Sequence, residues 1–168
     1  MNEMCHGPLA FCLVRKGLLE GTNLEFNHKN THYKQMEVIE ATIPIEEYQR
    51  LRAVCGLSPK TDEACEIGLK NSLYSVIIKE GDVIIGMGRV IGDGGCFCQV
   101  VDICVVPEQQ GKGIGKVIMA SIAEFIKTKL PTSCYTSLIA DGNASYLYEQ
   151  FGFQDTMPES KGLYLKNG

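Results

Sequence analysis

The segment from Gln110 to Gly115 most clearly predicts chemistry, because glycine stands at alternate positions in it. A β-rich run ends just before the segment, and apolar residues recur at helical spacing after it. We therefore expect a strand to end and a helix to begin here, which leaves the first N–H groups of the helix without partners inside it. Those groups and the helix dipole can hold a pyrophosphate. The candidate ligands are Gly111, Lys112, Gly113, Ile114, Gly115 and Lys116.

Two familiar phosphate-binding loops do not fit these residues. A Walker A loop needs Ser or Thr after its Gly-Lys pair, where this chain has Val117, and a glycine where it has Gln110. A dinucleotide-binding fingerprint has the spacing Gly-x-Gly-x-x-Gly, but Lys116 stands where its third glycine would be. The loop therefore disfavours a nucleotide-binding protein of either kind.

The spacing Gln-x-x-Gly-x-Gly, formed by Gln110, Gly113 and Gly115, resembles the cofactor loop of the GCN5-related N-acetyltransferase (GNAT) superfamily. Residues 101–107 resemble that family's fourth strand, which leads into the loop. Residues 143–153 resemble its second signature helix, including a Tyr-Glu-x-x-Gly-Phe ending. The chain therefore looks like a small stand-alone member of the superfamily.

The resemblance implies a mixed α/β (α+β) domain over residues 36–168, with a central mixed, mostly antiparallel sheet flanked by helices. It implies acetyl-coenzyme A (acetyl-CoA) as the cofactor, in a V-shaped opening between the fourth and fifth strands. The pantetheine would pair with the backbone of Cys104, Val105 and Val106, and the pyrophosphate would rest on residues 111–116. A primary amine of a small molecule would attack the thioester directly in a ternary complex, and an N–H near Val105 would stabilise the oxyanion.

Tyr148 occupies the position that the family uses for its general acid, which returns a proton to the leaving thiolate. A phenol suits this task because its pKa is close to that of a thiol. Packing is the alternative role, since Tyr148 lies on one apolar stripe with Leu147 and Phe151. Asn143 has two readings as well: the resemblance makes it a cofactor ligand, whereas the sequence also allows a helix N-cap.

The general base stays open at this stage. Some members that acetylate protein lysines carry a glutamate on the fourth strand, and the matching position here is Gln99, which cannot accept a proton. Asp102 is the nearest carboxylate, but its apolar neighbours also suit a buried, hydrogen-bonded structural group. A water relay to solvent is the third alternative.

The main alternative function is a catalytically silent acyl-CoA-binding sensor or regulatory module. The acidic composition slightly favours a cationic acceptor, and the likeness to small stand-alone members favours a small-molecule or arylalkylamine-like acceptor over histones. Homodimers formed through the C-terminal strands are common in the family, so the resemblance leaves a homodimer open.

The elements that must position these residues follow from periodicity, caps and turns. A glycine or proline closes most of them, and Thr61 is the expected cap of the second helix. We expect strands over 36–39, 73–79, 83–92, 96–106, 134–140, 153–154 and 162–166, and helices over 44–55, 62–70, 113–130 and 143–151.

Composition agrees with one folded domain and excludes several partners. The 168 residues include 45% hydrophobic and 21% charged side chains, which is ordinary for a globular protein. A net charge of −4 and the absence of a long basic run argue against nucleic-acid binding and against a polybasic membrane anchor. The apolar stretch 8–14 is too short to span a membrane. We expect a cytoplasmic protein.

No metal site is expected. The eight cysteines contain no Cys-x-x-Cys pair and stand mostly in apolar surroundings, so we interpret them as reduced thiols. Cys96 and Cys98 share one face of an expected strand, and His28 and His32 have a metal-ligand spacing only if helical, without a third ligand. Residues 1–35, where the polar tract with these histidines lies, are expected to form an irregular arm or an added strand.

Overall fold

A computed structural model of the protein describes residues 36–165. The expected N-terminal arm or added strand, residues 1–35, lies outside this range. Among the helices of the described range, none has the length and apolar character needed to cross a membrane.

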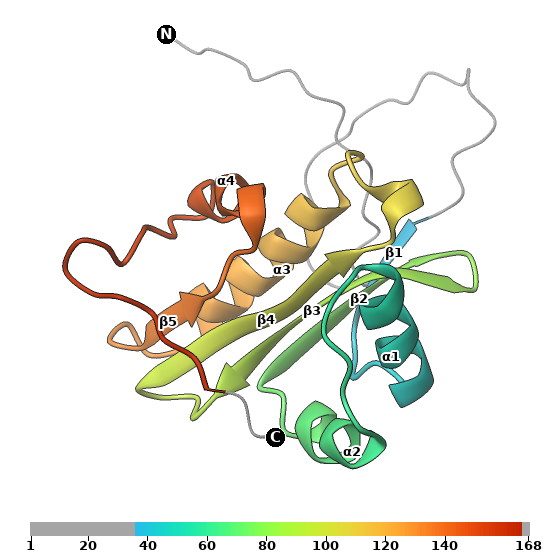
Figure 1. The fold of residues 1–168 in the computed structure, drawn as a ribbon, viewed down its shortest axis with the longest axis horizontal. Helices are drawn as coiled ribbons and strands as arrows, with labels where there is room; N and C mark the ends of the chain where they lie inside the picture. Colours follow the sequence, from blue (N-terminus) through green and yellow to red (C-terminus); the bar gives the residue numbers. More distant parts are fainter. Residues whose placement is uncertain (1–35, 166–168) are drawn as a thin grey trace, which may run out of the picture.

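One five-stranded sheet forms the centre of the domain (Figure 1). Its strands lie side by side in chain order; neighbouring strands are antiparallel except for the last pair, which is parallel. This is the mixed, mostly antiparallel sheet that the sequence predicts. The strands are β1 (Met36–Glu40), β2 (Tyr74–Glu80), β3 (Val83–Gly92), β4 (Phe97–Val105) and β5 (Tyr135–Leu138).

Helices cover both faces of the sheet (Figure 1). One long helix packs on one face, two shorter helices pack on the other, and a last short helix lies beside the start of the long one. They are α1 (Ile45–Val54), α2 (Asp62–Lys70), α3 (Ile114–Lys129) and α4 (Ser145–Glu149), with 3₁₀ turns η1 (Pro107–Gln109) and η2 (Gly142–Ala144).

Local signals explain where most of these helices begin and end. The Thr61 side chain accepts a hydrogen bond from the N–H of Ala64 at 3.2 Å, so it caps α2 as predicted. Pro44 directly precedes α1, where its fixed φ of −58° leads the chain into the helix. Helix α3 ends before Leu130 because the following Pro131 disfavours a helical residue at that position.

Helix α3 packs closely on β3 because two residues of that strand are glycines. A methyl group at Gly88 would lie 2.6 Å from both Ile103 Cδ1 and Ile118 Cγ2, and one at Gly86 would lie 3.2 Å from Ile118 Cδ1. The helix therefore buries Ile118 and Ile122 completely against the sheet. Burying an isoleucine side chain of this size contributes about 1.5–3 kcal/mol.

Strand β4 contains a bulge near the point where its pairing with β5 ends. Asp102 and Ile103 together oppose Gly88 of β3, and Asp102 has a left-handed φ of 58°. Such a bulge bends its strand and increases the local twist. Pairing with β5 stops at Val100, whereas β4 continues to Val105. The predicted opening between β4 and β5 therefore begins at the bulge.

Three expectations about the C-terminal part are wrong. Residues 153–154 form no strand, because the N–H of Phe153 bonds to the carbonyl of Tyr148 and closes the end of α4. Residues 162–165 form none either: Leu163, Tyr164 and Leu165 are more than four-fifths exposed, with no described strand beside them to accept their backbone hydrogen bonds. Asn143 does not cap α4, since it lies inside η2 and the helix follows Ala144.

The packing of α3 makes a stability prediction at Gly88. Replacing Gly88 with Ala should lower the free energy of unfolding by about 1–3 kcal/mol, because the added methyl group overpacks Ile103 and Ile118. Urea denaturation followed by circular dichroism measures the change. The matched control is Gly68→Ala in α2, where a methyl group meets nothing within 4 Å and should stabilise by up to about 1 kcal/mol. Equal stability of Gly88→Ala and the parent protein would contradict this packing argument.

Candidate active site

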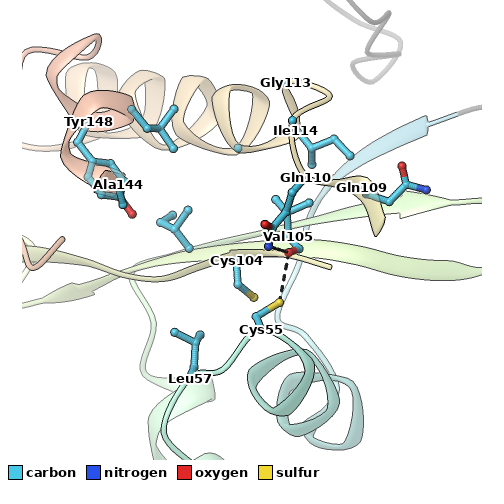
Figure 2. A pocket seen from close by; sticks show the side chains of 14 residues that line it. Cys55, Leu57, Cys104, Val105, Gln109, Gln110, Gly113, Ile114, Ala144 and Tyr148 are labelled. Atoms are coloured by element: carbon cyan, nitrogen blue, oxygen red, sulfur yellow. Dashed lines mark hydrogen bonds between the residues drawn. The ribbon is translucent and has the colours of Figure 1, made fainter. Parts of the chain in front are cut away.

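A cavity of about 350 Å³ lies where β4 leaves β5 (Figure 2). Its wall comes from five places in the chain: the end of α1, the end of β4, the loop after η1, the start of α3, and the η2–α4 segment. The lining residues are Cys55, Leu57, Ile103, Cys104, Val105, Gln109, Gln110, Gly111, Gly113, Ile114, Gly115, Ala144, Leu147 and Tyr148.

The glycine loop brings the N terminus of α3 to the cavity wall. Gly111 and Gly113 have φ angles of 75° and 84°, in the left-handed region that glycine adopts without strain. The first helical hydrogen bonds run from the N–H groups of Lys116 and Val117 to the carbonyl of Gly113. The N–H groups of Ile114 and Gly115 are thus left without helical partners, as an anion site requires.

Gly115 has a different reason to be glycine. A methyl group there would lie 3.3 Å from Leu147 Cδ2, so its small size lets α4 pack against the start of α3. Built at Gly111 or Gly113, a methyl group meets no atom within 4 Å. Backbone conformation therefore selects glycine in the loop, and helix packing selects it at Gly115.

The two lysines of the predicted cradle stand at its rim. Lys112 and Lys116 are exposed and do not line the cavity. Lys112 Nζ donates to Gln109 Oε1 at 2.8 Å, and Gln109 Nε2 donates to Glu80 at 3.1 Å. Lys112 is therefore held close to the loop by the side chain of Gln109.

The end of β4 presents backbone groups to the cavity. The carbonyl of Val105 accepts hydrogen bonds from Gln110 Nε2 at 2.9 Å and from Cys55 Sγ at 3.3 Å. The next residue, Val106, donates its N–H to Ile85 on the opposite side, at 2.9 Å. Since successive residues of a strand face opposite edges, the N–H of Val105 faces the cavity. Of the three predicted pantetheine ligands, Cys104 and Val105 line the cavity, whereas Val106 follows β4 and bonds through its N–H to Ile85.

Tyr148 faces these groups from α4. Figure 2 shows its ring pointing from the helix toward β4. Only 8% of the residue is exposed, and its ring meets Phe153 edge-on at 6.4 Å. Burial, and then the negative charge of Asp141, raise the pKa of Tyr148 above its usual 10.0. The phenol therefore keeps its proton at neutral pH. Asn143, in the neighbouring turn, is exposed and does not line the cavity.

Two thiols lie in the same wall, below Val105 in Figure 2. Burial raises the pKa of Cys104 far above its ordinary value, and the adjacent Cys55 adds to the rise. Burial also raises the pKa of Cys55, although its contact with Cys104 opposes the rise. Both side chains are thus thiols rather than thiolates at neutral pH.

Asp102 does not face the cavity but lies in a buried ion cluster. Its carboxylate accepts from Arg89 Nε at 2.8 Å, from Tyr48 Oη at 3.0 Å and from the guanidinium of Arg52. The two guanidinium groups also lie 5.3 Å from the centre of the Tyr48 ring. About one-tenth or less of each charged side chain is exposed. These contacts agree with the structural alternative for Asp102.

Sequence reasoning missed several residues of the wall. Cys55 and Leu57 follow α1, Ile103 sits in the bulge, and Ala144 and Leu147 come from the η2–α4 segment. No local pattern marks them, because only the folded arrangement brings these segments to β4. Gln99 faces Ile91 and Ser137 in neighbouring strands and does not line the cavity.

Two pairs of residues, Cys96 with Cys98 and His28 with His32, are the metal-ligand candidates that the sequence disfavours. Among residues 36–165, no group of three or more His, Cys, Asp or Glu could hold a metal ion. Cys96 is exposed and Cys98 is buried, where its Sγ lies 3.4 Å from Cys134 Sγ. The other pair, His28 and His32, lies outside the described residues.

Comparison with known proteins places residues 58–165 in the family described as the acetyltransferase (GNAT) domain. A protein of unknown function from meticillin-resistant Staphylococcus aureus, described as a probable acetyltransferase, has a solved structure with 47% sequence identity and a TM-score of 0.76. The match covers 79% of this chain and all of that one.

Two further relatives are more distant. A GNAT-family acetyltransferase from Streptococcus pneumoniae shares the fold, with a TM-score of 0.65 at 23% identity over 79% of this chain and 98% of that one. An uncharacterised N-acetyltransferase of Pyropia yezoensis is 28% identical over 103 residues, which cover 59% of this chain. The chain spans only 58% of the length of that relative.

The ion cluster makes a stability prediction at Asp102. Replacing Asp102 with Asn should lower the free energy of unfolding by about 3–5 kcal/mol, because Arg52 and Arg89 lose their buried counter-charge. Thermal and urea unfolding of the variant measure the loss. The control is Asp155→Asn, on an exposed residue after α4, which should change stability by less than about 0.5 kcal/mol. If Asp102→Asn is as stable as the parent protein, the cluster does not hold β4 to α1.

Proposed function

The chain belongs to the GNAT acetyltransferase family, and from that premise we propose that it is an N-acetyltransferase that transfers the acetyl group of acetyl-CoA to a primary amine of a small molecule. The observation that supports this best is the juxtaposition, in one cavity, of the α3 N terminus with its free N–H groups, the backbone at Val105, and the phenol of Tyr148. The first two suit a donor with a phosphate-bearing tail, and the third suits proton return to a thiolate.

The chain's residues fit the cofactor that the family uses. The N–H groups of Ile114 and Gly115 would hold the pyrophosphate, with Lys112 and Lys116 at the rim adding positive charge. The end of β4, where Cys104 lines the cavity and the N–H of Val105 faces it, would hold the pantetheine arm, and Asn143 is proposed as a further contact. Bound acetyl-CoA supplies the acetyl group as an activated thioester.

Each remaining role falls to a group in the wall. The N–H of Val105 is placed to donate to the acetyl carbonyl oxygen, where negative charge develops during attack. Gln110 and Cys55 hold this part of β4 through the carbonyl of the same residue. Tyr148 then gives its proton to the departing sulfur, for which a protonated phenol is required.

We propose direct transfer in a ternary complex rather than an acetyl-enzyme. A covalent route would need a nucleophile in the wall, and the thiols of Cys55 and Cys104 are the strongest nucleophiles there. Burial keeps both of them protonated, which removes most of their reactivity. The amine itself is therefore the better nucleophile.

The proposal is tested by titrating the purified chain with acetyl-CoA and then following release of free thiol with a panel of primary amines. In this assay Tyr148→Phe should bind acetyl-CoA with unchanged affinity but turn over about 100-fold more slowly or worse, because only the acidic proton is removed.

The parent protein makes a prediction about pH. Its rate of turnover should not fall through loss of the Tyr148 proton below about pH 10, since burial raises the pKa of Tyr148.

The matched control is Tyr146→Phe, two residues away on α4 with an exposed side chain, which should leave both affinity and rate unchanged. An undiminished rate in Tyr148→Phe would assign that tyrosine to packing alone. Cofactor binding without turnover on any amine would favour the acyl-CoA sensor, and absence of binding would remove the proposal.

Direct transfer makes a separate kinetic prediction. Initial rates measured over a grid of acetyl-CoA and amine concentrations should give intersecting double-reciprocal lines, and intact-mass spectra of protein mixed with acetyl-CoA alone should show no acetylated chain. Parallel lines together with an acetyl group on Cys55 or Cys104 would establish the covalent route instead.

A further inference from the structure

Acetyl transfer to nitrogen requires the acceptor as a free amine, because an ammonium ion has no lone pair with which to attack. A simple alkylamine resembles a lysine side chain, with a pKa of about 10.4, whereas an α-amine has a pKa of about 7.7–8.0. The cavity must therefore either remove a proton from the bound acceptor or receive the acceptor already neutral.

The titratable side chains of the described cavity wall are proton donors. They are Cys55, Cys104 and Tyr148, and burial is the main reason why the pKa of each is raised. A group that holds its proton at neutral pH cannot take another from an ammonium ion. These three side chains of the described wall therefore cannot remove the proton from an acceptor that enters as an ammonium ion.

The carboxylates nearest to the wall are engaged or lie outside it. Glu80 accepts a hydrogen bond from the wall residue Gln109 at 3.1 Å and does not itself line the cavity. Asp102 accepts hydrogen bonds from Arg52, Arg89 and Tyr48, so a proton on it would leave two buried guanidinium groups without their counter-ion. Asp141 and Glu108 are exposed and do not line the cavity, although their charges raise the pKa values of Tyr148 and Cys55 respectively. The cations around the wall include Arg50, near Cys55, and Arg52, near Cys104. Lys112 and Lys116 stand at the rim on the side of the glycine loop.

The remaining side chains of the described wall are apolar except for those of Gln109 and Gln110. Leu57 from the α1–α2 loop, Ile103 from the bulge and Leu147 from α4 contribute hydrocarbon to it. No side chain of the described wall carries a negative charge at neutral pH that would hold an ammonium ion. An alkylammonium acceptor would therefore lose its hydration without gaining an ion pair.

Resting on the acetyl transfer proposed above, we propose that the acceptor is a primary amine of low basicity that enters the cavity in its neutral form, of the class of α-amino amides with an apolar side chain. The neutral amine meets the requirement for a lone pair, and the apolar side chain matches Leu57, Ile103 and Leu147. This class differs from the cationic acceptor that the acidic composition favours.

The expected preference follows from the neutral fractions of the two kinds of amine. At pH 7 about one alkylamine molecule in 2,500 is neutral, against about one in seven for an α-amine, a ratio of several hundred. A more basic amine is a better nucleophile once neutral, which offsets part of that ratio. We therefore expect at least about a tenfold preference in kcat/KM at pH 7 for the less basic of two matched amines.

The test uses phenylalaninamide and 2-phenylethylamine, which share one skeleton and differ in the carboxamide that lowers amine basicity. Their kcat/KM values are measured with the full chain and saturating acetyl-CoA between pH 6 and 10. For phenylalaninamide the value should rise with pH and level off at the pKa of its own amine, whereas for 2-phenylethylamine, whose pKa of about 10.4 lies above this range, the value should still be rising at pH 10. The alkylamine should approach the amide in rate only at the alkaline end.

Two results would overturn the inference. If both amines level off at one common pH, or if kcat/KM falls above the pKa of the amine, the ammonium form binds and a group of the protein removes its proton. Equal or faster turnover of 2-phenylethylamine at pH 7 would overturn it too. Glu108→Gln and Asp141→Asn should leave the pH profiles of both amines unchanged, and a variant that loses its rise with pH would identify its carboxylate as the base.

Failure of acetyl transfer itself would give a different result from failure of the low-basicity acceptor alone. If neither amine releases thiol even at pH 10, where the amide is almost fully neutral and about a quarter of the alkylamine is neutral, while acetyl-CoA still binds, then acetyl transfer itself fails and this inference falls with it. Turnover of both amines with a common levelling point instead keeps the function and rejects only the low-basicity acceptor.

Discussion

Asp102 joins three elements of the domain through a single carboxylate. It accepts from Arg52 and Tyr48 of α1 and from Arg89 of β3, while its own left-handed backbone forms the bulge of β4. Two buried cations against one anion are costly to desolvate, so the cluster is weak evidence for net stability. Its value is geometric, because the contacts of Asp102 tie α1 and β3 directly to the bulge of β4.

The shape of the cavity depends on that position. Arg52 lies three residues before Cys55, whose thiol bonds to the carbonyl of Val105, so fixing α1 also fixes the contact at the end of β4. The bulge leaves β4 without β5 beyond Val100, and Gly88 gives the bulge room beneath α3. One buried interaction therefore helps to position both α1 and the end of β4 in the wall.

The sequence predicted features that depend on neighbours along the chain. The cap at Thr61, the β2–β3 hairpin, the end of β4 and the start of α3 at Gly113 all lie at or within a residue or two of their predicted places. The expected strand at 162–166 failed because a strand needs a partner, and apolar residues such as Leu163 and Tyr164 do not specify one. Cys55 and Leu57 went unnoticed for the same reason, since only tertiary contacts bring them to β4.

Residue type alone could not decide whether Asp102 acts as the general base or as a structural group. Sequence offered a carboxylate close to the reacting groups, and either role was open to it. In the fold, its contacts with two guanidinium groups make its negative charge a condition of the packing of α1 and β3 on β4. A carboxylate used in this way cannot also cycle through a protonated state without disturbing the cavity it shapes. Asp102, which holds the site together, is for that reason poorly suited to proton transfer within it. The acceptor proposed above needs no such transfer, because it is proposed to enter as the neutral amine.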